Sequence, residues 1–118
     1  MYAIRRHKRI ALPATASLTV KGGPRVQSLQ TMVADISLSG IGVYSDHAIT
    51  VGKEIAMDIY FVSSDGSLKS TSVEGNSHYV RRIRDIYYVG IHFKEDLAPE
   101  KQPLLYECLM VLLKCQCN

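Results

Sequence analysis

Two short stretches of this 118-residue sequence carry the residue types that bind anionic, planar ligands. The first runs from Arg5 to Arg9 and places four fixed positive charges in five residues. The second, residues 35–40, reads Asp-Ile-Ser-Leu-Ser-Gly and begins 26 residues after Arg9. Guanidinium groups present planar forks of donors that match phosphate oxygens and the O6 and N7 atoms of guanine. The order Arg-x-x-x-Arg, then Asp-x-Ser-x-x-Gly, therefore suits an anionic ligand that also carries hydrogen-bonding ring edges.

These stretches offer complementary contacts for such a ligand. Arg5 and Arg9 can hold one ligand from a flexible arm, and Arg6 lies between them and can assist. Lysines would not replace them, because an ammonium group lacks the bidentate geometry. A carboxylate beside a phosphate is repulsive, so we expect Asp35 to face a base, where it can accept the N1–H and N2–H₂ donors of a guanine edge. Ser37 can bond either a base edge or the turn itself.

Two further residues belong to the candidate site. Gly40 gives the turn its backbone freedom and lets a ligand approach the backbone closely. His78 can flank the ligand as a polar or stacking residue, although the arginines near it are equally consistent with solvated charges. Each motif is common when taken alone, because basic runs are usually solvated tails and Asp-x-Ser-x-x-Gly is usually an ordinary turn. The prediction therefore depends on their combination.

The composition is that of a single globular domain. With 47% apolar and 21% charged residues, the chain can bury a core but is too short for two domains. The net charge is +3, yet outside residues 5–9 the remaining ten Lys and Arg face eleven Asp and Glu. The basic charge thus belongs to one segment, which indicates a local anion site rather than a broad nucleic-acid surface.

Alternation of apolar with small or polar residues predicts six β-strands. The cleanest alternation runs from Ile55 to Phe61, and segments rich in Gly, Pro, Asp and Ser separate the strands. The composition of 35–42 predicts a turn, and Gly75 predicts a bulge or a bend inside the fifth strand. The expected strands cover residues 12–20, 26–34, 41–44, 55–61, 67–83 and 87–93.

Near the C-terminus the period changes to that of a helix. Pro99 suits a first helical turn, and the apolar run from Leu104 to Leu113 contains no breaker. Its apolar stripe is wide enough to pack across one end of a barrel and also to bury a partner's helix. We expect a flexible basic arm (1–11), a small six-stranded antiparallel β-barrel (12–97) and a C-terminal α-helix packed on the barrel (98–118).

In this order, and ahead of a strand-rich body, the two motifs resemble those of the PilZ domain. The segment Tyr-Val-Gly-Ile-His-Phe at residues 88–93 also resembles the closing strand of that family, and the likeness extends over roughly residues 5–94. The resemblance implies a split β-barrel that serves as a receptor for the bacterial second messenger cyclic di-GMP. It assigns Arg5 and Arg9 as the defining arginine pair.

The resemblance also bears on stoichiometry and output. In the family, a basic residue just before the arginine motif favours a stacked pair of ligand molecules, whereas an apolar one favours a single molecule. Ile4 occupies this position, which implies one ligand per protomer. The motif begins close to Met1, which implies a stand-alone receptor, monomeric or dimeric through its helix, that signals to an unknown partner protein. No residue selects among motility, pili, exopolysaccharide synthesis and virulence as the regulated process.

Two other functions are alternatives. One is a PilZ-like interaction module that does not bind the nucleotide and works through its apolar helix, but the complete set of motif residues argues against it. The other is a barrel that binds single-stranded nucleic acid, which would need stacking aromatic residues beside a basic groove. Because the charge outside the arm is slightly negative, we expect neither DNA nor RNA as a partner.

Catalysis and membrane insertion are not expected. The sequence contains no nucleophile–base pair, metal constellation, P-loop or dinucleotide fingerprint, so we expect no cofactor beyond the ligand. The apolar run before residue 114 is too short to cross a bilayer. Without a secretory signal, an odd number of cysteines indicates reduced thiols and a cytoplasmic location. These cysteines are Cys108, Cys115 and Cys117.

Overall fold

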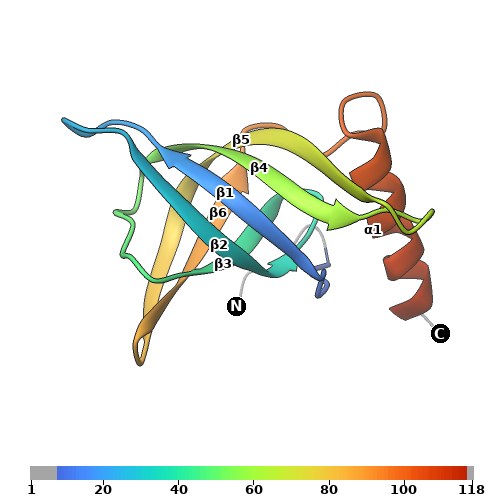
Figure 1. Cartoon of the computed structure of the whole chain (residues 1–118), viewed down its shortest axis with the longest axis horizontal. Coiled ribbons are helices and arrows are strands. Elements are labelled where there is room, and N and C mark those ends of the chain that lie inside the picture. The colour runs from blue at the N-terminus through green and yellow to red at the C-terminus, as the bar shows by residue number, and fades with distance from the viewer. Residues whose placement is uncertain (1–7, 117–118) are drawn as a thin grey trace, which may run out of the picture.

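The structure, a computed structural model, describes residues 8–116 (Figure 1). Within this part of the chain, six β-strands are followed by one α-helix. The strands are β1 (Ala14–Val20), β2 (Gln27–Ile36), β3 (Gly40–Ser45), β4 (Glu54–Val62), β5 (Leu68–Ile83) and β6 (Ile86–Phe93), and the helix is α1 (Pro103–Gln116).

The strands form one closed antiparallel barrel in the order β1-β2-β3-β6-β5-β4, with β4 pairing back onto β1. The 16-residue strand β5 makes this closure possible, because residues 68–76 pair with β4 and residues 75–83 pair with β6. This arrangement confirms the predicted architecture, a small six-stranded antiparallel β-barrel with a C-terminal helix.

Inward-facing residues of the strands fill the barrel. On β4, the side chains of Ile55, Ile59 and Phe61 are each at most 1% exposed. Burial of such side chains stabilises the folded state by about 25 cal/mol per Å² of apolar surface removed from water. Successive strand residues point to opposite faces, so the residues between the buried positions lie on the outer surface. On β6 the outward positions are Tyr88, Gly90 and His92, of which Gly90 is buried because the His78 ring lies over it.

The turn between β2 and β3 is shorter than the predicted segment 35–42. Strand β2 continues to Ile36 and β3 begins at Gly40, so that only residues 37–39 lie between the strands. The composition overestimated the turn because backbone pairing extends over its polar ends. Asp35 is therefore held on a strand and not in a loop.

The irregularity in β5 lies further along the chain than Gly75. That residue pairs regularly with both β4 and β6, whereas the register with β6 shifts between Ser77 and Tyr79. Glycine is needed at position 75 because a Cβ there would collide with a backbone carbonyl of β6. The bulge falls on His78.

The helix begins at Pro103, four residues after the predicted Pro99 start. Residues 98–102 form a turn, in which the Gln102 amide donates to the Ala98 carbonyl (2.8 Å) and the Gln102 side chain accepts from the Ala98 amide (3.0 Å). Proline lacks an N–H group, which the first helical position does not need, and its ring disfavours helix before it. These two properties set the start of α1.

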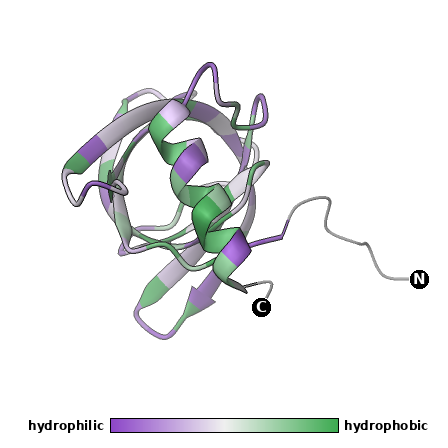
Figure 2. Ribbon diagram, turned by 90° about the vertical axis from the view of Figure 1, so that its right-hand side faces the viewer, coloured by the Kyte–Doolittle hydropathy of each residue, from purple (hydrophilic) through white to green (hydrophobic). Residues whose placement is uncertain are grey.

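Helix α1 lies across one end of the barrel (Figure 2). Leu105 and Leu109 are 0% and 1% exposed and belong to the barrel core. Leu104 and Val111 remain 44% and 48% exposed. One face of the helix thus closes the barrel and another stays in solvent.

Candidate functional site

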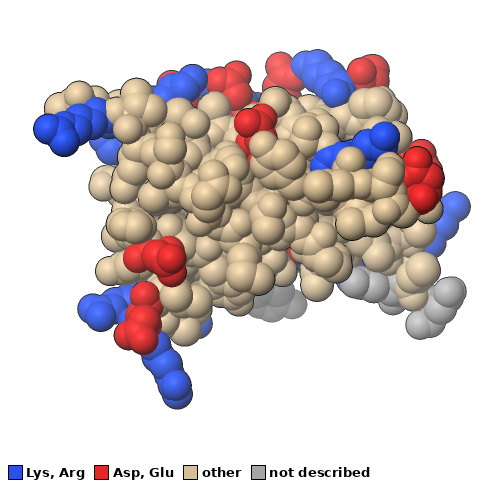
Figure 3. Space-filling view, viewed as in Figure 1, with Lys and Arg blue, Asp and Glu red and all other residues tan. Residues whose placement is uncertain are grey.

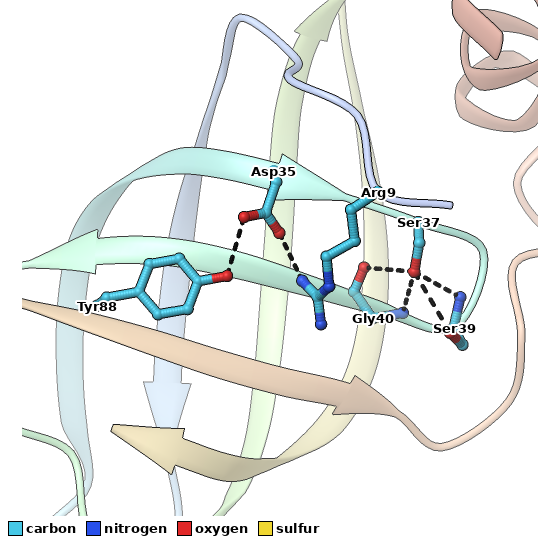
Figure 4. A network of polar contacts seen from close by, with 6 residues as sticks. All are labelled: Arg9, Asp35, Ser37, Ser39, Gly40 and Tyr88. Carbon is cyan, nitrogen blue, oxygen red and sulfur yellow. Dashed lines mark hydrogen bonds and ion pairs between the residues drawn. The ribbon is translucent and has the colours of Figure 1, made fainter. Parts of the chain in front are cut away.

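The backbone next to Arg9 is fixed on the barrel. Ile10 and Ile36 exchange two backbone hydrogen bonds, each 2.9 Å long, and the Ile10 side chain is 2% exposed. This bridge brings Arg9 beside Asp35, and its Nη1 donates to Asp35 Oδ1 at 2.5 Å (Figure 4). The two side chains are 17% and 27% exposed, so the ion pair is only partly screened by water.

The second oxygen of the Asp35 carboxylate is also bonded. The Tyr88 hydroxyl donates to Asp35 Oδ2 at 2.9 Å from the outer face of β6 (Figure 4). The ring of Tyr88 makes edge contacts with the rings of Tyr44 and Tyr79, at centroid distances of 5.9 and 6.1 Å. Asp35 is therefore oriented from two directions by groups that are distant in the sequence.

Glycines form the surface beside Asp35. In the sheet register, Asp35 lies opposite Gly42, Gly42 opposite Gly90, and Gly90 opposite Tyr79. A Cβ on Gly42 would collide with the Tyr88 ring, and one on Gly90 would lie 3.0 Å from a ring carbon of His78. Because the two glycines have no side chains, the Tyr88 ring packs directly on the backbone of Gly42 and the His78 ring on that of Gly90.

Ser37 stabilises the turn between β2 and β3. It is 4% exposed, and its hydroxyl oxygen accepts the amide hydrogens of Ser39 and Gly40, both at 3.2 Å. The Ser37 amide donates to the Gly40 carbonyl at 2.8 Å. Of the two contacts expected for Ser37, a base edge or the turn, the structure contains the second.

Gly40 is required by the sheet. A Cβ at this position would lie 2.7 Å from the carbonyl oxygen of Ile91 on β6, closer than side chains approach backbone oxygens. The motif Asp-x-Ser-x-x-Gly thus combines one half-buried carboxylate with a serine and a glycine that fix the hairpin carrying it.

His78 lies at the bulge of β5 and stacks on His92, with ring centroids 3.6 Å apart and planes inclined by 21°. It shares a cavity of about 460 Å³ with Arg9, although the two residues come from opposite ends of the barrel sequence. The complete lining of this cavity, which we call the tyrosine cavity, is Arg9, Tyr44, His78, Tyr79, Arg81, Ile83, Tyr88 and Gly90.

The structure brings together most of the predicted site residues that it describes. Arg9 and Asp35 are in contact, Ser37 and Gly40 support the hairpin, and His78 lines the adjoining cavity. The predicted Arg5 and Arg6 lie outside the described residues. An acceptor, a donor fork and a set of aromatic rings at one place can bind an anion that carries a flat, hydrogen-bonding ring.

Comparison with known families identifies the family of this chain. The family model of the PilZ domain matches residues 3–110, which is most of the chain. The chain belongs to the PilZ domain family. The match confirms the resemblance seen in the two sequence motifs.

Solved PilZ structures share the fold of this domain at low sequence identity. The Bacillus subtilis inhibitor of motility MotI/DgrA has a TM-score of 0.71 and 16% identity, over 96% of this chain and 53% of its own. The PilZ domain of Escherichia coli YcgR with c-di-GMP has a TM-score of 0.64 and 16% identity, over 95% of this chain and 94% of its own. The K. pneumonia MrkH–c-di-GMP complex has a TM-score of 0.66 and 12% identity, over 98% of this chain and 55% of its own.

The chain thus spans about half the length of MotI/DgrA and MrkH. No curated protein matches this PilZ domain by sequence. Residues 8–116 contain no group of three or more metal-ligating side chains and no helix that is long and apolar enough to cross a membrane.

Sequence reasoning missed the tyrosines of this PilZ domain. From the sequence, Tyr88 and Tyr44 are placed only within the expected strands 87–93 and 41–44, and neither is assigned to the site. A usable signal is the pair of glycines at 42 and 90, since bare positions on neighbouring strands make room for a large ring. That signal requires the register between β3 and β6, which the sequence alone does not provide.

A second cavity, of about 560 Å³, lies on the other side of the barrel, near the start of α1. Its cations are neutralised locally: Lys94 pairs with Glu54 and Lys101 with Glu95. The hydrogen bond from Lys94 lowers the pKa of Glu54, and the same bond raises the pKa of Lys94. On the face shown in Figure 3, most lysines and arginines lie toward the periphery, and several of them lie beside acidic residues. This cavity is less suited to an anion than the tyrosine cavity.

Proposed function

We propose that this PilZ domain is a receptor for cyclic di-GMP. The observation that carries the proposal is the contact of Arg9 with Asp35 at the edge of the tyrosine cavity, because it joins a phosphate-binding fork to an acceptor for a guanine edge. Two of the structures with the same fold, those of YcgR and MrkH, are complexes with c-di-GMP. We regard the protein as a receptor and not as an enzyme.

Each polar group has a distinct task in this proposal. Arg9, together with Arg5 and Arg6 from outside the described residues, binds phosphates and base faces. Asp35 accepts the N1–H and N2–H₂ donors of one guanine, and His78 flanks the ligand inside the tyrosine cavity. Because Ile4 is apolar, we propose one ligand molecule per protomer.

Ligand binding then requires an exchange of partners. In the structure Arg9 donates to Asp35 Oδ1, and the same guanidinium is needed by the phosphate of the ligand. We propose that the ligand takes both groups, so that Arg9 turns to the phosphate while the residues before Ile10 close over the barrel. Ordering a segment on binding costs conformational entropy, which the charge-assisted hydrogen bonds must exceed.

The closed arm offers a new surface to a partner protein. The chain would act in the cytoplasm, as a monomer or as a homodimer through α1, on which Leu104 and Val111 are exposed. The alternative is a PilZ module that does not bind the nucleotide and works through this helix alone. The exposed stripe on α1 is the observation that favours it.

Thermal unfolding tests the proposal. A ligand that binds only the folded state stabilises it by about 2.7 kcal/mol at a hundred times its dissociation constant, which raises the melting temperature by several degrees. We expect this rise with cyclic di-GMP and not with GTP at equal concentration. An unchanged melting temperature at millimolar cyclic di-GMP would favour the non-binding module.

A further inference from the structure

The side chain of Tyr88 is held on several sides. Its ring rests on the bare backbone of Gly42 and contacts the rings of Tyr44 and Tyr79 at their edges. A ring in these contacts has little freedom to rotate away from the barrel. Its hydroxyl is thereby directed at Asp35 Oδ2, at 2.9 Å.

The hydrogen bonds from Arg9 and from Tyr88 to Asp35 change differently when the proposed ligand binds. Arg9 comes from the segment that closes over the ligand and is itself needed by the phosphates. Tyr88 comes from a central position of β6, paired with both β3 and β5, and does not have to move. Each carboxylate oxygen has two lone pairs, so Oδ2 can accept from Tyr88 and from a base at the same time.

We infer that Tyr88 is a positioning residue, which fixes the plane of the Asp35 carboxylate and so makes the site selective for the 2-amino group of guanine. The inference rests on the proposed function, since it assumes that Asp35 accepts a guanine edge. In the structure Arg9 also bonds Asp35, but in the proposed binding mode Arg9 turns to the phosphate, whereas Tyr88 keeps its bond to the carboxylate.

The chemistry of the base explains the selectivity. Guanine presents two neighbouring donors, N1–H and the 2-amino group, and a carboxylate can accept both only when its plane is aligned with the base. Hypoxanthine keeps N1–H, O6 and N7 but lacks the 2-amino group. Aligning a freely rotating carboxylate with the base costs conformational entropy, and this cost offsets the gain from the second donor. Removal of the Tyr88 hydroxyl should therefore weaken guanine binding more than hypoxanthine binding.

A matched pair of variants isolates the hydroxyl. Tyr88→Phe keeps the ring on Gly42 and removes only the hydrogen bond to Asp35. Tyr44→Phe removes a hydroxyl from the same cavity and the same aromatic cluster. Within the described residues, the hydrogen bonds to the Asp35 carboxylate come from Arg9 and Tyr88 and not from Tyr44. A merely structural role of the hydroxyl would therefore affect both variants alike.

The experiment is calorimetric titration of the wild type and both variants with cyclic di-GMP and with cyclic di-IMP, its hypoxanthine counterpart. We expect the wild type and Tyr44→Phe to bind cyclic di-GMP about tenfold more tightly than cyclic di-IMP, which is the contribution of one charge-assisted hydrogen bond. In Tyr88→Phe the preference should fall to roughly twofold or less, mainly through weaker binding of cyclic di-GMP.

The outcomes are distinct. If Tyr88→Phe keeps the wild-type preference, whether or not both ligands bind more weakly, Tyr88 does not set the selectivity and the inference is overturned. If the wild type binds neither ligand, the proposed function itself fails, and the inference fails with it. Melting temperatures of the three proteins identify a variant that is unfolded, in which case Gly42→Ala, which displaces the same hydroxyl, replaces Tyr88→Phe.

Discussion

The ring of Tyr88 lies directly over Gly42, so that a side chain at position 42 would collide with its hydroxyl oxygen. The colliding atoms belong to a side chain and not to the backbone, so a methyl group at position 42 would force the Tyr88 ring out of its contacts without moving the sheet. We therefore expect Gly42→Ala to fold, to displace Tyr88 from Asp35 and to lose about 1 kcal/mol of stability. Binding of cyclic di-GMP should weaken by about tenfold in calorimetry.

Gly40→Ala is the matched control for this change. Its new methyl group would meet the backbone carbonyl of Ile91 at 2.7 Å, and backbone cannot move aside as a side chain can. We expect a loss of about 1–3 kcal/mol in urea denaturation, larger than that of Gly42→Ala. Equal stability of the two variants would contradict the difference drawn between these glycines.

Ser37→Ala should lower the free energy of unfolding by about 1 kcal/mol. The buried hydroxyl accepts the amide hydrogens of Ser39 and Gly40, which would lose this partner in the variant. Urea denaturation measures the loss. Ser39→Ala is the control, because the Ser39 hydroxyl makes one weaker contact, at 3.3 Å to Ser37, and should cost clearly less. A larger loss in Ser39→Ala would show that Ser37 does not hold the turn.

Leu109→Ala should destabilise the protein by about 2–5 kcal/mol, because this side chain is 1% exposed where α1 closes the barrel. Val111→Ser, one-half exposed on the same helix, is the control and should change stability by less than about 0.5 kcal/mol. Both values come from urea denaturation. If the two substitutions cost the same, α1 does not pack on the barrel in solution as described.

Asp65 should stabilise the β4–β5 hairpin in a pH-dependent way. Its Oδ1 accepts hydrogen bonds from the Ser63 hydroxyl and from the Ser67 amide and hydroxyl, and these bonds lower its pKa well below the usual value of 3.8. A depressed pKa stabilises the fold above the unfolded value, and the contribution disappears as pH falls through the folded value.

The melting temperature of Asp65→Ala should thus lie below that of the wild type at pH 7, by a difference that shrinks below about pH 4. Asp85→Ala, in the β5–β6 turn, is the control, since its carboxylate makes no such bond within the described part of the chain. A difference that stays constant from pH 7 to pH 3 would contradict the role assigned to these bonds.

The barrel could be predicted from the sequence because its core residues alternate with the strand period. The run from Ile55 to Phe61 identifies a buried strand without knowledge of its neighbours. Arg9 and Asp35 could be selected because their two motifs, each common alone, occur together and in this order. Their direct contact depends on the bridge between Ile10 and Ile36, which no local pattern reveals.

The rest of the site depends on long-range register. The position of Tyr88 next to Asp35 follows from the pairing of Gly42 with Gly90, and a shift by one residue would place the ring inside the barrel. The bulge at His78 was expected at Gly75, because glycine marks both bulges and close backbone contacts. In this chain it marks a close contact.

Titration calorimetry of cyclic di-GMP into the wild type and Arg9→Ala tests the central claim most directly. The Arg9 guanidinium is a cation that both contacts Asp35 and lines the tyrosine cavity, so its loss should affect binding more than folding. We predict one ligand per protomer, a dissociation constant in the micromolar range or tighter, and a loss of at least about tenfold in the variant. No heat with the wild type, or equal affinity in Arg9→Ala, would contradict the account.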